Sequence, residues 1–315
     1  MSDLEKSILS VIVYFDIFDY PLTLMEVGRY SDTKSWMSEV RKCLEYLSHE
    51  GLVMSRDGFY FLKDRHGLVS QRMQRYNIAE RKFRRALRVL KILKSLPFVR
   101  MIAVCNNLAY SNARDKSDID LFIVSKAGRI WCCRFFILMA LKILGLRPKG
   151  EKTRDKICAS FFTTEESLDL EKIKLADDIY LHYWLEQVAP IFDEGIYDKF
   201  RGQNLWVCEN DYGWEMIGRR KLLNCRRPRA LSFVERSKGG IAKLLRCFCE
   251  KLFLNVDERF YRWLQMRIMP RRLKDLANKN TDVIVNDRML KFHDNDRRGY
   301  YRDEFKRRII GQNIE

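Results

Sequence analysis

Residues 117–124, Ser-Asp-Ile-Asp-Leu-Phe-Ile-Val, constrain the fold more than any other stretch of this 315-residue chain. The spacing of Ile119 and Leu121 predicts a β-strand with one face in a hydrophobic core. Side chains two residues apart leave a strand on the same face, so Asp118 and Asp120 are expected to lie close together. Such a pair of carboxylates suits Mg²⁺, which commonly takes one or two carboxylates together with substrate phosphates. The alternative is a strand that enters from a polar turn, with both aspartates solvated.

A second apolar run, Val99–Cys105, precedes this strand and is itself of strand type. Between the two runs, a polar turn leads into a predicted short helix. This order resembles the nucleotidyltransferase superfamily that includes DNA polymerase beta. The family signature is a hydrophobic residue, Gly, and Gly or Ser, followed about ten residues later by Asp, a hydrophobic residue, and Asp or Glu. Here Cys105, Asn106 and Asn107 take the first three places, and ten residues separate Asn107 from Asp118.

Many bacterial members read Gly-Ser-x-Ala-x-Gly-x-Ala-Arg-x-x-Ser-Asp-Ile-Asp-Leu over this stretch. The chain matches that pattern at Ala109, Ala113, Arg114, Ser117, Asp118, Ile119, Asp120 and Leu121. The resemblance implies a nucleotidyltransferase-fold mixed sheet with flanking helices over residues 99–175. It also implies an NTP substrate and Mg²⁺, or Mn²⁺ in its place, held by Asp118 and Asp120 as the catalytic metal ligands. The nucleotide-binding side chains that it implies are Asn106, Asn107, Ser111 and Ser117.

The glycines of the family pattern are replaced in this chain. Asn106-Asn107 stands for the Gly-Ser pair, and Ser111 stands for the later glycine. Asparagine visits the left-handed backbone region more readily than most residues, which favours survival of the turn. Its amide also offers donors to a phosphate oxygen. Its side chain nevertheless adds bulk where glycine admits close approach.

The third carboxylate of the family has no clear counterpart. Members commonly carry it on a later strand, where it helps to activate the acceptor hydroxyl. The next strand-like run, Lys156–Phe162, contains no acidic residue. Asp155, just before this run, is the candidate if the strand begins early.

The resemblance implies two alternative functions. The leading hypothesis is a Mg²⁺-dependent nucleotidyltransferase that moves a nucleoside monophosphate from an NTP to an unidentified hydroxyl acceptor. The alternative is a catalytically inactive protein of the same fold that acts as a nucleic-acid- or protein-binding regulatory module. Salt-sensitive binding of RNA or DNA that survives loss of Asp118 and Asp120 would favour the alternative.

Residues 1–64 predict a winged-helix-like domain. Thr23 and Glu26 have the spacing of a helix capping box, and Asp57-Gly58 predicts a hairpin turn. The segment holds 11 Asp and Glu against 7 Lys and Arg. Because DNA affinity rests largely on the neutralisation of phosphates, contact with a protein is expected in preference to DNA binding.

The formal net charge of +17 is concentrated in two segments that flank the predicted core. Residues 65–98 predict a basic linker helix with 10 Lys and Arg against one acid, and residues 218–275 hold 17 against 5. Both segments favour RNA or another anionic partner, while a solvated helix is the alternative for 65–98. The region from 176 to 315 is predicted to be mainly helical and basic.

The remaining composition indicates a cytoplasmic protein, and the predicted elements together with the resemblance imply an α+β fold. Nine scattered cysteines form no CxxC pair, which argues against a zinc site and is typical of a reducing compartment. The longest apolar run, residues 130–146, is interrupted by Arg134 and Lys142. A helix packed on the core is therefore expected there, in place of a transmembrane segment.

Overall fold

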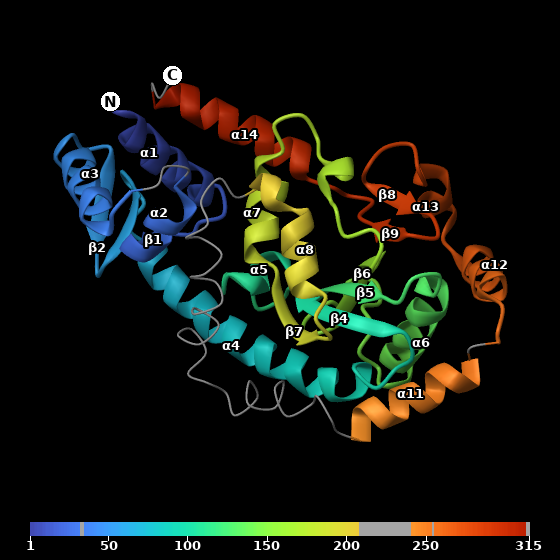
Figure 1. Cartoon of the computed structure of the whole chain (residues 1–315). Coiled ribbons are helices and arrows are strands. Elements are labelled where there is room, and N and C mark those ends of the chain that lie inside the picture. Colours follow the sequence, from blue (N-terminus) through green and yellow to red (C-terminus); the bar gives the residue numbers. More distant parts are fainter. Residues whose placement is uncertain (32–34, 208–240, 254, 313–315) are drawn as a thin grey trace.

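The computed structural model describes residues 1–31, 35–207, 241–253 and 255–312, and its fold is α+β (Figure 1). A mixed six-stranded sheet in the order β7-β4-β5-β6-β9-β8 forms its centre. The strands are β4 Val99–Val104, β5 Ile119–Ser125, β6 Ile157–Thr164, β7 Ala189–Asp193, β8 Val283–Val285 and β9 Met289–Phe292. Strands β5 and β6 run parallel, and the other neighbouring pairs are antiparallel.

Both faces of this sheet are covered by helices. The covering helices are α4 Leu68–Leu93 and α6 Ile130–Ile143 on one face, and α7 Ile179–Gln187 and α8 Tyr197–Gln203 on the other. Ile119 and Leu121 of β5 are buried in the first of these cores, and Phe122 is buried in the second. The alternation predicted for this strand is therefore confirmed, as is a core-packed helix within residues 130–146. Asp118 and Asp120 have the parity of Phe122, which directs them to the face covered by α7.

The N-terminal part combines three helices with a three-stranded sheet of order β1-β3-β2. Its elements are α1 Asp3–Asp16, β1 Leu22–Thr23, α2 Leu24–Tyr30, α3 Met37–His49, β2 Val53–Arg56 and β3 Phe59–Leu62. Thr23 and Glu26 form the predicted capping box at the start of α2. Strands β2 and β3 turn at Asp57 and Gly58, whose φ angles of 53° and 79° suit a two-residue hairpin turn. Both predictions are confirmed.

The C-terminal part differs from the mainly helical region that the sequence predicts. Its helices in the described ranges after residue 240 are α11 Ile241–Phe253, α12 Glu258–Ile268, α13 Arg271–Leu276 and α14 Arg298–Gly311. The region after residue 175 also supplies β7, β8 and β9, which extend the sheet beyond residues 99–175. These short segments form strands because they pair with strands distant in sequence. Their own residues predict strands only weakly, since β7 contains Pro190 and β9 contains Lys291.

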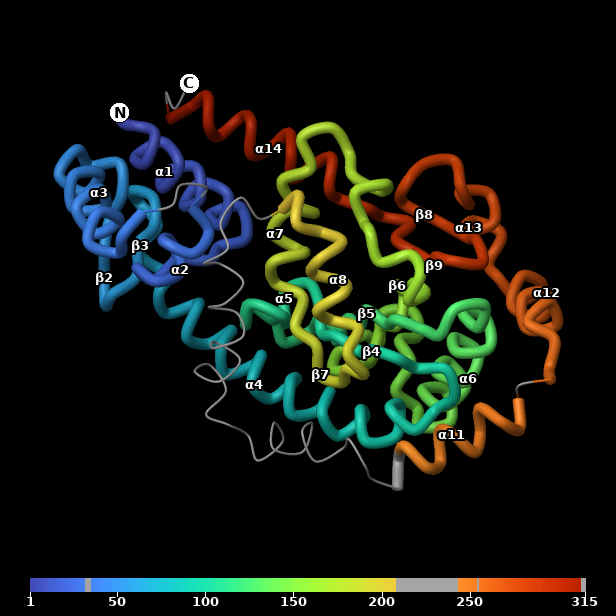
Figure 2. The backbone as a smooth tube through the Cα atoms, viewed as in Figure 1, coloured from blue at the N-terminus to red at the C-terminus, as the bar shows by residue number. Residues whose placement is uncertain are grey.

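Helix α4 connects the two halves of the molecule. Figure 2 shows it running from the N-terminal part along the central sheet towards α11. At its far end, Arg246 of α11 donates a hydrogen bond to the carbonyl of Lys94 at 3.0 Å. Helix α14 returns to the N-terminal part, where Arg308 pairs with Asp16. Chain segments far apart in sequence therefore enclose the sheet.

Many basic residues of the linker helix pair with acids from other elements. Arg72 pairs with Glu26 at 2.8 Å, and Arg75 pairs with Asp19 at 3.2 Å. Lys82 is fully buried. Residues 65–98 therefore present fewer unpaired cations to an anionic partner than the sequence predicts. In the second basic segment, residues 218–240 lie outside the described ranges.

None of the helices in the described ranges combines the length and the apolar character that a membrane span requires.

Candidate functional site

Asp118 and Asp120 line a cavity of about 540 Å³, a size typical of small-molecule sites. The cavity lies between the sheet, helix α7 and the chain segment that follows β9. Asn106 and Asn107, from the short helix α5 Asn106–Ala109, line it as well. The structure thus brings together four of the six side chains that the sequence predicts for the site.

The two aspartates form a cluster with Cys158 of β6. One potential ligand atom from each residue lies within 4.8 Å of the other two. Cys158 stands directly opposite Asp120 in the parallel pairing of β5 and β6. A thiol therefore occupies the neighbouring-strand position where the family resemblance predicts a carboxylate. Sequence analysis missed it because a cysteine in an apolar strand is ordinarily a core residue.

Asp155 takes a different role from that of a third carboxylate. Its Oδ1 accepts hydrogen bonds from Lys82 Nζ at 2.8 Å and from Arg81 Nη2 at 3.2 Å. Burial raises the pKa of Asp155, but the hydrogen bond and charge of Lys82 outweigh this effect and hold the pKa below its usual value. Within the described ranges, the cluster contains two carboxylates and one thiol. Asp155 is instead the counter-ion of a buried lysine.

Asp118 and Asp120 are difficult to ionise together when no cation is bound. Burial and the charge of Asp118 raise the pKa of Asp120 to about 7, and burial raises the pKa of Asp118. Burial, with the charge of Asp120, also raises the pKa of the Cys158 thiol to about 12. Two carboxylates that are difficult to ionise together become stable as anions when a cation lies between them.

The donor set distinguishes hard from soft metal ions. Asp118 and Asp120 fit Mg²⁺ or Mn²⁺, which prefer oxygen ligands. With such an ion, Cys158 would remain a neutral neighbour, because its thiol is protonated at neutral pH. A softer ion such as Zn²⁺ or Cd²⁺ would instead displace the thiol proton and bind sulfur.

The turn before the aspartates keeps the backbone conformation that glycine would favour. Asn106 has a φ of 54° and Ser111 a φ of 64°, and these are the two positions where the family pattern has glycine. Asn106 thus adopts the left-handed backbone region that asparagine tolerates better than most residues. Trp184 Nε1 donates to Asn106 Oδ1 at 2.9 Å, and the Asn106 side chain hydrogen-bonds Asp120, which lowers the pKa of Asp120. The Asn106 amide therefore orients the Asp120 carboxylate.

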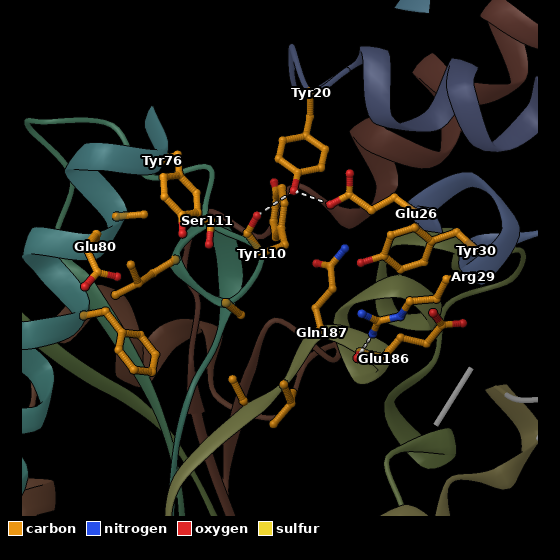
Figure 3. A pocket seen from close by; sticks show the side chains of 16 residues that line it. Tyr20, Glu26, Arg29, Tyr30, Tyr76, Glu80, Tyr110, Ser111, Glu186 and Gln187 are labelled. Atoms are coloured by element: carbon orange, nitrogen blue, oxygen red, sulfur yellow. Dashed lines mark hydrogen bonds between the residues drawn. The ribbon is translucent and has the colours of Figure 1, made fainter. Parts of the chain in front are cut away.

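The two predicted serines lie elsewhere. Ser117 Oγ donates to the carbonyl of Arg114 at 2.8 Å, so its hydroxyl stabilises its own turn. Ser111 lines a second, smaller pocket of about 120 Å³ between the N-terminal part, α4 and the end of α7 (Figure 3). Ser111 therefore does not line the cavity that contains the aspartates.

The second pocket lies at the joint between the N-terminal part and the loop after α5. The Tyr20 hydroxyl shares its single proton between Glu26 Oε1 at 3.0 Å and the carbonyl of Tyr110 at 2.8 Å (Figure 3). On the other side, Arg29 Nη2 donates to the carbonyl of Glu186 at 2.9 Å. The Tyr20–Tyr110 bond ties the N-terminal part to the loop after α5, and the Arg29–Glu186 bond ties it to the end of α7.

Residues 291–298 contribute cavity-lining groups that sequence analysis left without a role. His293 Nε2 lies 3.2 Å from Ser160 Oγ, and burial lowers the pKa of His293 to about 4, which keeps the ring neutral. Asp296 pairs with both Lys291 and Arg298. In the sequence, the polar and charged run His-Asp-Asn-Asp-Arg-Arg directly after β9 could have indicated that this segment lines a site.

Comparisons with family models, curated proteins and solved structures found no match. The functional interpretation of the cavity therefore rests on its own residues and on the sequence pattern around Asp118.

The raised pKa of Asp120 predicts an unusual effect of replacing it. Between its ordinary pKa of 3.8 and the folded value of about 7, folded Asp120 keeps a proton that the unfolded chain has lost. Stability is therefore expected to fall as pH rises through this window. We expect Asp120→Asn to stabilise the metal-free protein by about 1–3 kcal/mol at about pH 8. The difference should shrink towards about pH 4, where the wild-type carboxyl is also neutral.

Urea unfolding of both proteins with a chelator present, at the two pH values, measures this difference. A variant that is less stable than the wild type at the higher pH would contradict the predicted burial of charge at Asp120.

Cys158 provides a test of metal preference. We expect Cys158→Ser to keep the affinity for Mg²⁺, because the neutral thiol does not bind a hard ion. The same variant should lose the sulfur-to-metal absorption band of the Cd²⁺ complex. Replacement of the exposed Cys247 by serine is the matched control and should change neither property. An equal Cd²⁺ band in wild type and Cys158→Ser would exclude Cys158 from the cluster's ligand set.

Proposed function

We propose that this chain is a divalent-metal-dependent nucleotidyltransferase that moves a nucleoside monophosphate from an NTP to a hydroxyl acceptor. The observation that carries the proposal is the convergence of Asp118 and Asp120 with the Asn106 turn on one cavity. The order strand, short helix, strand from β4 to β5 supports a nucleotidyltransferase-type core. The left-handed backbone at Asn106 and Ser111 supports it further.

The site's own residues would prepare the reaction. A Mg²⁺ ion on Asp118 and Asp120 would supply charge neutralisation at the phosphates. Asn106 holds the Asp120 carboxylate in place through its hydrogen bond. His293, next to Ser160 on the cavity wall, would position the acceptor hydroxyl through a hydrogen bond, and the hydroxyl proton would pass to a phosphate oxygen of the NTP, because a pKa of about 4 makes the buried imidazole a weak proton acceptor. The enclosing helices and the segment after β9 would limit the access of water.

The N-terminal part supports a winged-helix-like assignment through its element order. A helix, a short strand, two helices and a two-stranded hairpin follow one another, and the strands join in one sheet. On α3, the exposed Arg41 and Lys42 are accompanied by the exposed Glu39 and Glu45. A surface of mixed charge suits contact with a protein better than contact with DNA phosphates.

A second candidate function is a non-catalytic regulatory module. The thiol of Cys158 in place of a third carboxylate favours it, because a soft neutral ligand adds nothing to a Mg²⁺ site. Such a module would bind nucleic acid or a protein without transferring a nucleotide. It would also keep this binding after both aspartates are replaced.

Nucleotide transfer can be tested directly. The protein is incubated with Mg²⁺ or Mn²⁺ and each α-labelled NTP, with RNA, proteins and small alcohols offered as acceptors. Transfer of label together with release of pyrophosphate is the expected result. Calorimetry that shows no heat of binding for any metal–NTP would overturn the proposed activity, and retained salt-sensitive RNA binding would then support the regulatory module.

A further inference from the structure

The cavity that contains the two aspartates also has a cationic wall. Lys291 of β9, Arg297 and Arg298 line it, and all three belong to the segment that begins in β9 and ends in the first turn of α14. These residues reach the aspartates only through the fold, because β9 pairs with β6 and β6 pairs with β5. The three cations differ in how far their charges are already satisfied.

Lys291 and Arg298 are committed to buried ion pairs. Lys291 Nζ lies 2.5 Å from Asp296 Oδ2, and the side chains of both residues are at least nine-tenths buried. Arg298 pairs with the same carboxylate at 2.9 Å and with Asp178 at 2.9 Å. Arg298 also donates to Thr281 Oγ1 at 2.7 Å. These contacts hold the chain on both sides of residue 297 in a fixed position.

Arg297 differs from Lys291 and Arg298 because its side chain is exposed and its charge can pair with a ligand. Within the described ranges, no carboxylate lies close enough to form an ion pair with it. Its guanidinium group lies over the rings of Tyr300 and Tyr301, at 4.6 Å and 5.4 Å from their centroids. A guanidinium that rests on an aromatic face still presents its N–H donors at the edge of the group.

The aromatic support under Arg297 is itself anchored. The ring of Tyr301 stacks on Tyr180 of α7, with centroids 5.2 Å apart and planes 15° apart. Phe18 packs on Tyr301 at 4.8 Å. All three aromatic residues line the same cavity. Arg297 is therefore supported in position before any ligand arrives, and such preorganisation lowers the entropic cost of binding.

We propose that Arg297 binds the polyphosphate part of the ligand in this cavity. In identifying that ligand as an NTP, the inference rests on the proposed nucleotidyltransferase function. An ion at Asp118 and Asp120 offsets the charge of those carboxylates and leaves most of the triphosphate charge unbalanced. A guanidinium group can bind two phosphate oxygens at once and balances part of this negative charge. Neutral side chains in the cavity wall would supply no such charge. Arg297 would thus hold the phosphates that leave as pyrophosphate.

Calorimetric titration with two probes tests this role, namely Mg²⁺–NTP and Mn²⁺–tripolyphosphate. Charge-assisted hydrogen bonds contribute about 1.5–3 kcal/mol, so we expect Arg297→Gln to weaken both affinities about 10- to 100-fold. Arg297→Lys should fall between this variant and the wild type, because lysine keeps the charge and loses the bidentate geometry. Arg288→Gln is the matched control, since Arg288 is exposed next to β9 and does not line the cavity.

Two of the three outcomes separate the role of Arg297 from the proposed function. If the wild type binds an NTP and Arg297→Gln binds it equally well, the role of Arg297 is overturned and the proposed function stands. If tripolyphosphate binding depends on Arg297 but no NTP binds, the polyphosphate site stands and the nucleotidyltransferase is overturned. If neither probe binds the wild-type protein, both are overturned.

Discussion

Replacement of Asp118 or Asp120 by asparagine is expected to abolish metal-dependent nucleotide binding. Their oxygens lie within 4.8 Å of each other and form the carboxylate part of the cluster. Loss of a metal that neutralises phosphate charge removes several kcal/mol of binding, so we expect affinity for Mg²⁺–NTP to fall roughly 100- to 1,000-fold. Nucleotide transfer should become undetectable in the same variants. Calorimetry and the label-transfer assay measure the two effects.

Asp115→Asn is the matched control for this experiment. Asp115 precedes the aspartate pair on the same loop but pairs with Arg81 at 2.7 Å and does not line the cavity. Its replacement should leave the affinity for Mg²⁺–NTP unchanged. Unchanged affinity in Asp118→Asn and Asp120→Asn would instead show that the nucleotide binds elsewhere. An equal loss in all three variants would indicate a general effect of charge on the loop.

Replacement of Lys82 by methionine is expected to cause the largest loss of stability. Lys82 Nζ is fully buried and donates to the carbonyls of Asp115 and Ser117, at 3.1 Å and 2.6 Å, and to Asp155 at 2.8 Å. Methionine would leave these acceptors without their donor. Removing one partner of a buried pair typically costs about 3–5 kcal/mol, and the partial exposure of Asp155 places our expectation at about 3 kcal/mol.

Urea unfolding measures this loss of stability, and two further variants test whether it comes from the buried ion pair. Arg84 pairs with Glu80 on the exposed side of the same helix, so Arg84→Ala should cost about 0.5 kcal/mol or less. The double replacement Lys82→Met with Asp155→Leu removes both charges and should recover part of the lost stability. A single Lys82 variant as stable as the wild type would contradict the buried network.

Lys82 also fixes the position of the proposed metal ligands. Its hydrogen bond to the carbonyl of Ser117 holds the residue directly before Asp118. We therefore expect the methionine variant, at temperatures where it remains folded, to bind metal more weakly than the wild type. The control Arg84→Ala should keep wild-type affinity.

The features predicted from sequence are those with a local cause. The alternation of β5, the capping box at Thr23 and the turn at Asp57-Gly58 depend on neighbouring residues alone, and all are present. The convergence of Asp118 and Asp120 also follows from two-residue spacing along one strand. Each of these predictions required no knowledge of distant contacts.

The features that sequence analysis missed depend on partners distant in the chain. Lys82 belongs to a run of basic residues that indicates a solvated helix, and its burial follows only from the position of the 115–117 loop. Cys158 joins the aspartates through strand pairing. Arg297 joins them through β9, a strand whose short and partly polar sequence gives little local signal.

Because β9 lies between β6 and β8, the central sheet can be completed only after β9 has been synthesised. Chains emerge with the N-terminus first, so β6 is made long before its neighbour β9. Until residues 289–292 arrive, the edge of β6 has unpaired backbone groups that invite pairing with other chains. We therefore expect the nascent chain to need protection by chaperones. A fragment that ends before β8 would carry both aspartates and yet lack the wall of the cavity that residues 291–298 supply.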